Sequence, residues 1–540
     1  MSEAVAPTPV VVEGDRFALW LDRNVPTGWR ALLVVALVHV IAALLAFDPT
    51  PQASGDNAAY HALAEALATG RGYVRLWEPT QPPETLYPPV FPLLIAAAMR
   101  LGVQSWAALH LLMICFSAAF VCASYGLLRR VVSPAQAFVC SVAVALSPAL
   151  LDASHALLSD VPFAALTAAA LWAFATLDAG DRHDAARERW LVAVGLVATV
   201  LAYFTRSAGL PLVIAAFAWL LWKRRLVVAG ILGAMVVPLA IAWSARARHQ
   251  GGAYTDFLRY IDPYQPELGR VDAVDVLVRM FSNLDLYASR HLPSLLYGGT
   301  DGFAAFGGWI CVILAVIGYW FRVRRPSVSE LWVPLYLGLL LLWPAAWSGD
   351  RLLLPMYPLL LAYAVLALPL TRVFLPRPVV VCTLVIAGIG LLSSDVQRAR
   401  RGVHCTSAYR RGTARPCVEN GWGDFTDLSM RLRGRLPDSS VILSRKPTIL
   451  YAESGYRSLM YPLSSAPDTF FAEARRAGAR YVVVDVSTLA NLYLFPALRT
   501  HPNRFCTLPD FQRIRASLMR IEPEGAQVST STAGDIKPCP

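Results

Sequence analysis

Two aspartates are the residues of this sequence best suited to acid–base chemistry. Asp56 stands at the start of a helical pattern, and Asp160 directly precedes an apolar segment. A carboxylate beside a reacting hydroxyl can accept its proton, and two carboxylates at one place can divide base and positioning roles. Each aspartate also has a structural alternative, because Asp before a helix often caps its first turn. We predict that both are catalytic, with helix capping as the competing interpretation.

Two arginines are candidates for binding an anion. Arg206 lies in YFTRSAGLP and Arg351 in WSGDRLLLPMYP, each where an apolar segment meets a polar one. A guanidinium group can hold a phosphate through two parallel hydrogen bonds. The alternative is an arginine that extends from a helix end to the membrane surface. We predict that both arginines bind an anionic group, with phosphate as the candidate.

The segment between the first two apolar stretches supplies a third group of candidates. Its Gly70-Arg71-Gly72-Tyr73 turn suits an oxygen-rich ligand, and Tyr87-Pro88-Pro89 keeps the chain extended as it returns to the next helix. We predict a substrate-binding loop here, which includes Tyr60, Arg71, Tyr73 and Tyr87.

The elements that must position these residues are membrane helices. Hydrophobic residues make up 56% of the 540 residues and charged residues 16%, whereas a soluble domain carries about 25% charged residues. Long apolar blocks such as Ala31–Phe47 match a hydrocarbon core about 30 Å thick. A soluble globule and a disordered chain are therefore excluded. The N-terminal region lacks the pattern of a cleaved signal peptide, so we expect an uncleaved first span.

Charge fixes the number and direction of the spans. We predict eleven: Ala31–Phe47, Ala107–Leu128, Ala135–Leu151, Val161–Leu177, Trp190–Phe204, Leu210–Trp222, Leu226–Trp243, Phe303–Phe321, Leu331–Trp347, Leu352–Leu370 and Val379–Leu392. Pro89–Leu101, about thirteen residues long, is too short for a span and is predicted to lie at the interface. With this count, five clusters of Arg and Lys fall on the cytoplasmic side, as the positive-inside rule requires. They are Arg129-Arg130, Arg182/Arg187/Arg189, Lys223-Arg224-Arg225, Arg322/Arg324/Arg325 and Arg372/Arg377.

The predicted organisation has four parts. Residues 1–30 form a cytoplasmic segment, and residues 31–393 form the membrane module with outer loops 48–88, 152–160 and 245–302. Residues 394–521 form an extracytoplasmic α/β domain, since Ser440–Leu443 and Tyr481–Val486 are typical of buried strands and Asp468–Ala477 of an amphipathic helix. Residues 522–540, rich in Ser, Thr, Gly and Pro, form a flexible tail.

The C-terminal region also carries charge and cysteines. From residue 395 onward there are 21 Arg and Lys against 13 Asp and Glu, which is +8 of the net charge of +11. This excess indicates membrane lipids or another anionic partner, and the absence of a basic stripe with aromatics argues against nucleic acid. Four cysteines allow three disulfide pairings in an oxidising compartment. We favour Cys405–Cys417 because they are closest in sequence, with Cys506 and Cys539 as the other two.

These residues occur in a recognisable order. D-x-x-x-Y and G-x-G-Y in the first outer loop are followed by YPP-x-x-PLL, S-D-x-P-F, T-R-x-x-G and R-x-x-L-P. Over roughly residues 34–370 this order resembles the polyprenyl-phosphate-dependent glycosyltransferases of the GT-C fold. It is most similar to the bacterial branch related to protein O-mannosyltransferases and lipid A aminoarabinose transferases.

The resemblance implies a reaction and assigns roles in it. A sugar would pass from a polyprenyl-phosphate donor to an extracytoplasmic hydroxyl, with Asp56 and Asp160 as the family's two loop acids and Arg206 and Arg351 near the donor phosphate. The lipid-phosphate sugar would be a co-substrate and no cofactor is predicted; a divalent cation is compatible with the acids but not indicated. Tyr87 departs from the lysine of aminoarabinose transferases, which argues against aminoarabinose as the donor sugar. The implied location is the inner membrane.

Two other classes of protein remain as alternatives. A polytopic transporter or flippase for a lipid-linked or anionic substrate would show repeated halves and ionisable residues near the bilayer midplane. No repeat is visible, and the ionisable residues lie at the span ends. A catalytically inactive scaffold is the second alternative. No HExxH, Walker loop, GxSxG or dinucleotide fingerprint occurs, which argues against a metalloprotease, an ATPase and an oxidoreductase.

Overall fold

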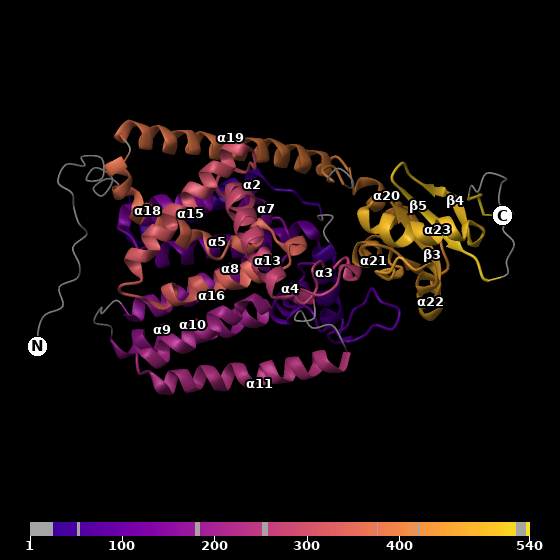
Figure 1. Ribbon diagram of the computed structural model, residues 1–540, viewed down its shortest axis with the longest axis horizontal. Helices are drawn as coiled ribbons and strands as arrows, with labels where there is room; N and C mark the ends of the chain where they lie inside the picture. The colour runs from indigo at the N-terminus through magenta and orange to yellow at the C-terminus, as the bar shows by residue number, and fades with distance from the viewer. Residues whose placement is uncertain are drawn as a thin grey trace, which may run out of the picture.

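The computed structural model shows a bundle of apolar helices with a small α/β domain at one end (Figure 1). It describes residues 25–50, 55–178, 184–250, 257–374, 376–413, 415–418, 422–524 and 536–539. The predicted cytoplasmic segment 1–30 and the predicted tail 522–540 therefore lie for the most part outside the described residues.

Apolar helices account for all the predicted spans. Seven helices of the described part are long and apolar enough to cross a membrane: α2 (Gly28–Leu45), α5 (Trp106–Leu128), α8 (Asp160–Asp178), α9 (Ala185–Thr205), α11 (Leu226–Gln250), α15 (Gly302–Arg322) and α19 (Arg377–Arg410). Five apolar helices are shorter: α4 (Val90–Arg100), α6 (Pro134–Ala145), α10 (Leu210–Trp222), α16 (Val328–Leu342) and α18 (Tyr357–Phe374). The predicted polytopic helical fold is confirmed, whereas the count of eleven spans stays a prediction.

Helix α4 covers the short segment that the sequence assigns to the interface. It has 11 residues, so at about 1.5 Å per residue it is roughly 16 Å long, about half of a hydrocarbon core. It packs against α9 and against α3 (Gly55–Ala68), a helix that is not among the apolar candidates for spans. This length and these contacts favour the interfacial position.

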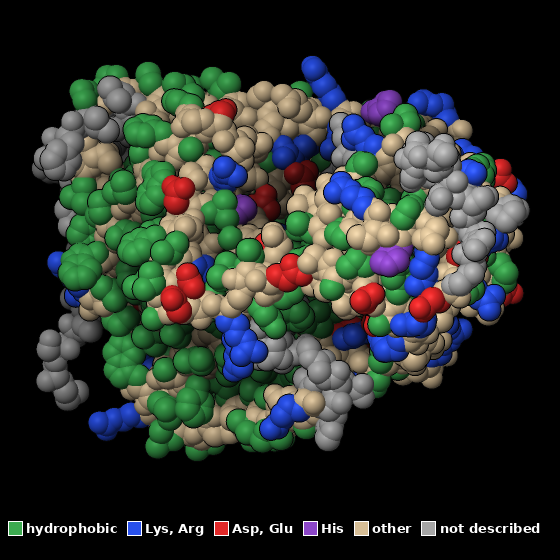
Figure 2. Space-filling model, turned by 45° about the vertical axis from the view of Figure 1, so that its right-hand side comes forward, with side chains coloured by type: hydrophobic (Ala, Val, Ile, Leu, Met, Phe, Trp, Pro, Cys, Tyr) green, Lys and Arg blue, Asp and Glu red, His purple; other side chains and the backbone are tan. Residues whose placement is uncertain are grey.

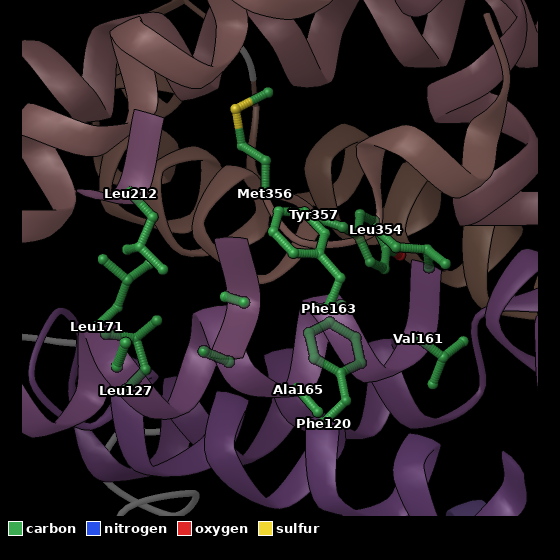
Figure 3. Packing of buried hydrophobic residues seen from close by; sticks show 14 of the residues in the cluster. Phe120, Leu127, Val161, Phe163, Ala165, Leu171, Leu212, Leu354, Met356 and Tyr357 are labelled. Carbon is green, nitrogen blue, oxygen red and sulfur yellow. The ribbon is translucent and has the colours of Figure 1, made fainter. Parts of the chain in front are cut away.

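The core of the bundle forms where α5 and α8 pack together and the segment that leads into α18 closes over them. Phe120, Phe163 and Tyr357 are almost completely buried there, and Figure 3 shows side chains from these elements turned toward one another. Helix α8 is rich in alanine, and small residues allow membrane helices to approach closely. The tightly packed α8 therefore provides a fixed support for its first residue, Asp160.

Short helices cover the end of the bundle that faces the C-terminal domain. They are α7 (Pro148–Ala153), η1 (Ser207–Gly209), η2 (Pro266–Leu268), α13 (Ala273–Leu286), η3 (Tyr287–His291), α14 (Leu292–Tyr297), η4 (Ala345–Trp347) and α17 (Asp350–Leu353). Helix α3 joins them and contacts α21 (Pro447–Ser454) of the C-terminal domain. The segments predicted as outer loops therefore meet at one end of the molecule.

The C-terminal domain contains a five-stranded mixed sheet in the order β2-β1-β3-β5-β4. Its strands are β1 (Val441–Leu443), β2 (Arg457–Leu459), β3 (Ala479–Asp485), β4 (Phe505–Gln512) and β5 (Ala516–Ile521). Four helices accompany the sheet: α20 (Gly423–Leu432), α21, α22 (Pro467–Ala477) and α23 (Phe495–Thr500). The two predicted strands correspond to β1 and β3, and the predicted helix to α22. The other three strands were not predicted: β2 has one apolar residue in three, β4 is interrupted by Pro509 and Asp510, and β5 has a single β-branched residue.

Helix α19 links the bundle to the C-terminal domain and runs along the side of the bundle (Figure 1). It has 34 residues and passes through the predicted domain boundary at residue 394 without a break. The structure pairs Cys405, near the end of α19, with Cys417, and it pairs Cys506 with Cys539. The five cysteines of the membrane module are free.

Both disulfides can be tested by peptide mapping. Under non-reducing conditions, protein purified from intact membranes should yield Cys405 linked to Cys417 and Cys506 linked to Cys539, because their Cα atoms are 5.7 and 4.9 Å apart, within the range that a disulfide spans. The free cysteines, such as Cys382, serve as controls and should be alkylated after denaturation. Recovery of alkylated Cys405 and Cys417 without reduction would contradict the assignment.

Candidate active site

The two predicted acids and the two predicted arginines form one cluster. Arg206 Nη1 lies 2.6 Å from Asp160 Oδ1. Arg351 bridges the two acids, with its Nη2 3.4 Å from Asp56 Oδ2 and its Nη1 3.9 Å from Asp160 Oδ2. Residues that are as many as 295 positions apart in the chain therefore meet at one place. This agrees with the prediction that all four lie on the same side of the membrane.

Asp56 is held by side chains from outside its own helix. It lies in the first turn of α3, and its Oδ1 accepts a hydrogen bond of 2.8 Å from the Tyr87 hydroxyl. Burial raises the pKa of Asp56, but the charge of Arg351, the Tyr87 hydrogen bond and the charge of Lys446 outweigh this and lower the pKa overall. The carboxylate is therefore ionised at neutral pH, in the state needed to accept a proton or to orient a hydroxyl.

Asp160 is the more buried of the two acids. It is the first residue of α8, and 2% of it is exposed. The preceding residue, Ser159, shares a hydrogen bond of 2.8 Å with the Tyr60 hydroxyl and accepts one of 3.4 Å from Arg206. A buried carboxylate needs compensating charge, and here two guanidinium groups provide it. Asp160 is therefore placed to hold the arginines rather than to reach solvent.

A break between two helices places Arg206 in the cluster. Arg206 caps the end of α9 with an extended backbone, and the chain then turns through η1 into α10. A Cβ on Gly209 would lie 2.7 Å from Tyr203 Cα, so this turn requires glycine. The sequence T-R-x-x-G thus has a physical basis, since the glycine permits the turn that aims the arginine.

Arg351 is fixed by the residue before it. The backbone N–H of Arg351 donates to Asp350 Oδ1 over 2.7 Å, and Asp350 Oδ2 accepts from the Ser294 hydroxyl over 2.7 Å. The nearby charge of Asp160 raises the pKa of Arg351. Arg351 is therefore charged, anchored at its backbone and free to reach between the two acids with its side chain.

Three of the four residues predicted for the substrate loop lie near the cluster of acids and arginines. Tyr60 and Tyr87 pack with their ring centroids 4.9 Å apart, and the Tyr73 hydroxyl donates to the Tyr87 carbonyl over 2.7 Å. Arg71 is exposed and lies in the part of the loop that approaches Tyr451 of α21. The structure therefore brings the three tyrosines to the cluster and leaves Arg71 at its periphery.

Lys446 is a site residue that the sequence analysis missed. It precedes α21 in the C-terminal domain, where the Thr448 hydroxyl donates to the Gly55 carbonyl over 2.9 Å. Lys446 Nζ lies 3.7 Å from the position that a Cβ on Gly55 would occupy. Burial lowers the pKa of Lys446, and Asp56 opposes this shift. No local pattern marks it, because Lys446 reaches the cluster only through the packing of α21 on α3.

Two of the cavities in the described part lie next to one another along Tyr87, Pro88 and Pro89. One is lined by both acids, Arg206, the Tyr60 and Tyr87 rings and apolar residues of α16. The other is an apolar groove of about 1200 Å³, its open mouth included, between α4, α9 and α11. Tyr73 and Arg246 stand at the polar end of this groove, where Arg246 donates to the carbonyls of Tyr73 and Glu84. The apolar groove and the pocket that holds Arg206 and both acids are thus lined by neighbouring residues, Pro89 and Pro88.

Few residues of the described part are arranged to hold a metal. One group of potential ligands lies close together, Asp48 with Cys405 and Cys417. Because both sulfurs belong to a disulfide, they cannot bind as thiolates. Asp56 and Asp160 are each engaged by an arginine. A cation at these acids would have to displace Arg351.

The comparisons with known proteins identify the fold. Over 91% of this chain and 98% of the other, the structure matches ArnT from Cupriavidus metallidurans in the apo state, with a TM-score of 0.54 and 13% identity. The same protein bound to undecaprenyl phosphate matches with a TM-score of 0.53, 13% identity and the same coverage. The oligosaccharyltransferase from Archaeoglobus fulgidus in complex with Zn and sulfate matches with a TM-score of 0.56 and 14% identity, over 89% of this chain and 72% of that one. This chain has the GT-C fold.

The sequence comparisons add a local match. Residues 87–245 fit the family model of dolichyl-phosphate-mannose-protein mannosyltransferases. No curated protein sequence matches the chain. The matched range begins at Tyr87 and includes Asp160 and Arg206, so it contains part of the cluster. The fold is the one that the sequence resemblance implies, and the family model matches residues 87–245 of the chain.

Proposed function

We propose that the protein transfers a sugar from a polyprenyl-phosphate donor to a hydroxyl group of an acceptor outside the cytoplasm. One observation carries this proposal: two acids and two arginines converge at the end of the bundle where an apolar groove opens. The groove suits an isoprenoid chain, the arginines suit its phosphate, and the acids suit a hydroxyl. ArnT, which shares this fold, binds undecaprenyl phosphate.

The donor would enter from the bilayer. Its chain would lie in the groove between α4, α9 and α11, and its phosphate would bind Arg206 and Arg351 beside Tyr87. The guanidinium groups stabilise the negative charge that grows on the phosphate as it leaves. Lys446 supplies a third positive charge from the C-terminal domain. This surplus of cations over the two acids favours a dianionic leaving group.

In the proposed reaction Asp56 acts on the acceptor. The acceptor oxygen forms a bond to the anomeric carbon, while the bond between that carbon and the phosphate oxygen breaks and its electron pair remains on the phosphate. The hydroxyl proton passes to Asp56, and the configuration at the anomeric carbon inverts. A phosphate leaving group needs no general acid, so one carboxylate suffices for proton transfer.

Arg351 would couple donor binding to the strength of this base. In the free protein Arg351 lowers the pKa of Asp56 and makes it a weak base. When Arg351 turns to the donor phosphate, the positive charge beside Asp56 is partly neutralised, and its pKa rises toward the ordinary value. Asp56 would thereby become an effective proton acceptor after the donor has bound.

A transporter gains no support from this geometry. Gly55, next to Asp56, contacts Thr448 of the C-terminal domain, so the cluster lies at the end of the bundle. Transport sites are typically found near the middle of the bilayer between related halves.

The proposal can be tested with purified protein. Incubation with undecaprenyl phosphate that carries a labelled sugar should release undecaprenyl phosphate in the presence of an envelope extract and label a component of that extract. Mass spectrometry of envelope glycans with and without the gene should show a missing sugar in the same component. Labelled sugar that crosses the membrane without changing its covalent partner would instead indicate transport.

The proposed location is the inner membrane, with the C-terminal domain outside the cytoplasm. This orientation places the Arg and Lys clusters between the predicted spans in the cytoplasm. A reporter that is active only in the periplasm should therefore be active when fused after Ser394, and a fusion after Arg225, at the opposite end of the bundle, is the inactive control. Activity of the reporter after Arg225 and not after Ser394 would reverse the orientation.

A further inference from the structure

A second large cavity lies on the other side of Arg351 and is not used by the donor. It measures about 1500 Å³ with its open mouth included, and α2, α7, α19 and the Cys405–Cys417 disulfide form its walls. In Figure 2 acidic, basic and histidine side chains gather in a hollow between the bundle and the C-terminal domain. We call this cavity the α7–α19 pocket.

Arg351 connects this pocket to the active site. It lines the α7–α19 pocket, and its guanidinium group pairs with Asp56 over 3.4 Å and with Asp160 over 3.9 Å. Leu158 lines both this pocket and the smaller cavity at the two acids. A ligand that fills the pocket therefore contacts Arg351, whose side chain pairs with the proposed base, Asp56.

The charged side chains of the pocket balance one another. Three acids, Asp48, Asp152 and Asp350, face three arginines, Arg351, Arg398 and Arg401. Asp152 and Arg398 form a two-fold ion pair, with Nε–Oδ1 and Nη2–Oδ2 distances of 2.9 Å. A site for a phosphorylated ligand needs a surplus of cationic donors, and the described residues that line this pocket provide none.

Paired charges suit hydroxyl groups, which donate and accept at the same time. The Asp152–Arg398 pair presents carboxylate acceptors beside guanidinium donors, and the Gln397 amide adds one group of each kind. Adjacent hydroxyls of a sugar ring can engage both members of such a pair. The composition therefore matches a neutral, polyhydroxylated ligand.

We propose that the α7–α19 pocket binds a neutral glycan as the acceptor and directs one of its hydroxyl groups past Arg351 to Asp56. This inference rests on the proposed function and specifies its acceptor: a sugar chain without phosphate or carboxylate groups. The acceptor enters from the aqueous side between α7 and α19, and the donor enters from the bilayer between α4, α9 and α11. The two substrates thus approach the cluster from different sides.

The test uses a neutral probe of defined chemistry. Full-length protein in detergent is irradiated with maltotriose that carries a photoactivatable diazirine, and the labelled peptides are identified by mass spectrometry. Label is expected in peptides that contain residues 148–158 and 394–405. Excess unlabelled maltotriose should remove it, and inorganic phosphate at the same concentration should not. Label elsewhere, or equal competition by phosphate, would overturn the assignment of a neutral glycan.

Two matched variants examine the pocket itself. Gln397 lines the pocket and is exposed, so Gln397→Trp should fill it without disturbing the fold and lower specific labelling about 10-fold or more. Val396, its exposed neighbour on α19, is not among the lining residues, and Val396→Trp should label like the parent protein. Full labelling of Gln397→Trp would place the glycan elsewhere.

Donor binding separates this inference from the proposed function. Both variants should bind labelled undecaprenyl phosphate as the parent protein does, because the groove between α4, α9 and α11 is unchanged. Loss of pocket labelling with intact donor binding supports the acceptor site. If the parent protein fails to bind undecaprenyl phosphate but still takes up the glycan label in the pocket, the proposed reaction fails and the glycan site stands.

Discussion

Replacing Asp56 by asparagine is expected to reduce sugar transfer by about 10²–10⁴-fold, the range typical for loss of a general base. Asparagine keeps the size and the hydrogen-bonding oxygen of the side chain but cannot accept the hydroxyl proton. The Tyr87 hydroxyl can still donate to it, so the loop should keep its place. The measurement is turnover of a labelled polyprenyl-phosphate sugar by purified protein, together with its melting temperature.

The competing interpretation, a helix cap, gives a different result. Asparagine caps a helix about as well as aspartate does, so Asp56→Asn would then leave both turnover and melting temperature nearly unchanged. Asp301 provides the matched control, since it caps α15 by accepting a hydrogen bond of 2.8 Å from the Ala304 backbone. Asp301→Asn should behave as a cap substitution. If Asp56→Asn behaves in the same way, the base must be sought at Asp160 or elsewhere.

The pH dependence follows from the lowered pKa of Asp56. The group is depressed below its ordinary value of 3.8, so it loses its charge only when the pH falls below that value. Protonation of Asp56 in the free protein should therefore not reduce kcat/KM between pH 7 and pH 5. Removing Arg351 should raise the pKa of Asp56 and move its titration toward this range. The assignment would be contradicted if the parent protein loses kcat/KM between pH 7 and pH 5 and Arg351→Ala does not.

The cluster could be predicted in large part from the sequence because membrane topology is a strong constraint. Once the Arg and Lys clusters fix the sidedness, Asp56 and Asp160 must lie at the same face, and Arg206 and Arg351 with them. Knowing on which side of the membrane these residues lie does not give the distances between their side chains, however. That Arg206 and Arg351 reach the acids depends on the close backbone approach at Gly209 and on the anchor at Asp350, respectively, and no distance for either contact can be read from the sequence.

The residues that were misplaced or missed share one physical cause. Lys446 reaches the cluster only because α21 packs on α3, a contact between parts of the chain nearly 400 residues apart. Arg71 looked suitable beside two glycines, but the turn that those glycines permit, with φ of 75° and 86°, carries it to the periphery. Local patterns identify turns and helix ends. They do not show which distant surface an exposed side chain will face.

Replacing Arg351 by alanine is expected to lower kcat/KM for the donor by about 10- to 100-fold, through both a higher KM and a lower kcat. Hydrogen bonds to charged groups contribute about 1.5–3 kcal/mol each, and about 1.4 kcal/mol corresponds to a factor of ten. Asp160 keeps Arg206 as a partner at 2.6 Å, so the cluster should not collapse. Arg129, an exposed arginine at the end of α5, provides the control Arg129→Ala, which should leave KM unchanged.

Arg351→Lys distinguishes a bridge from a simple positive charge. Arg351 uses different nitrogens for the two acids, Nη2 for Asp56 and Nη1 for Asp160, and the single ammonium group of lysine cannot reproduce this fork. The lysine variant should therefore restore part of the donor affinity and little of kcat. Full recovery of both would show that charge alone is sufficient. Asp56 would then be held in place by Tyr87 and Lys446, and the bridge between the two acids would not be needed for catalysis.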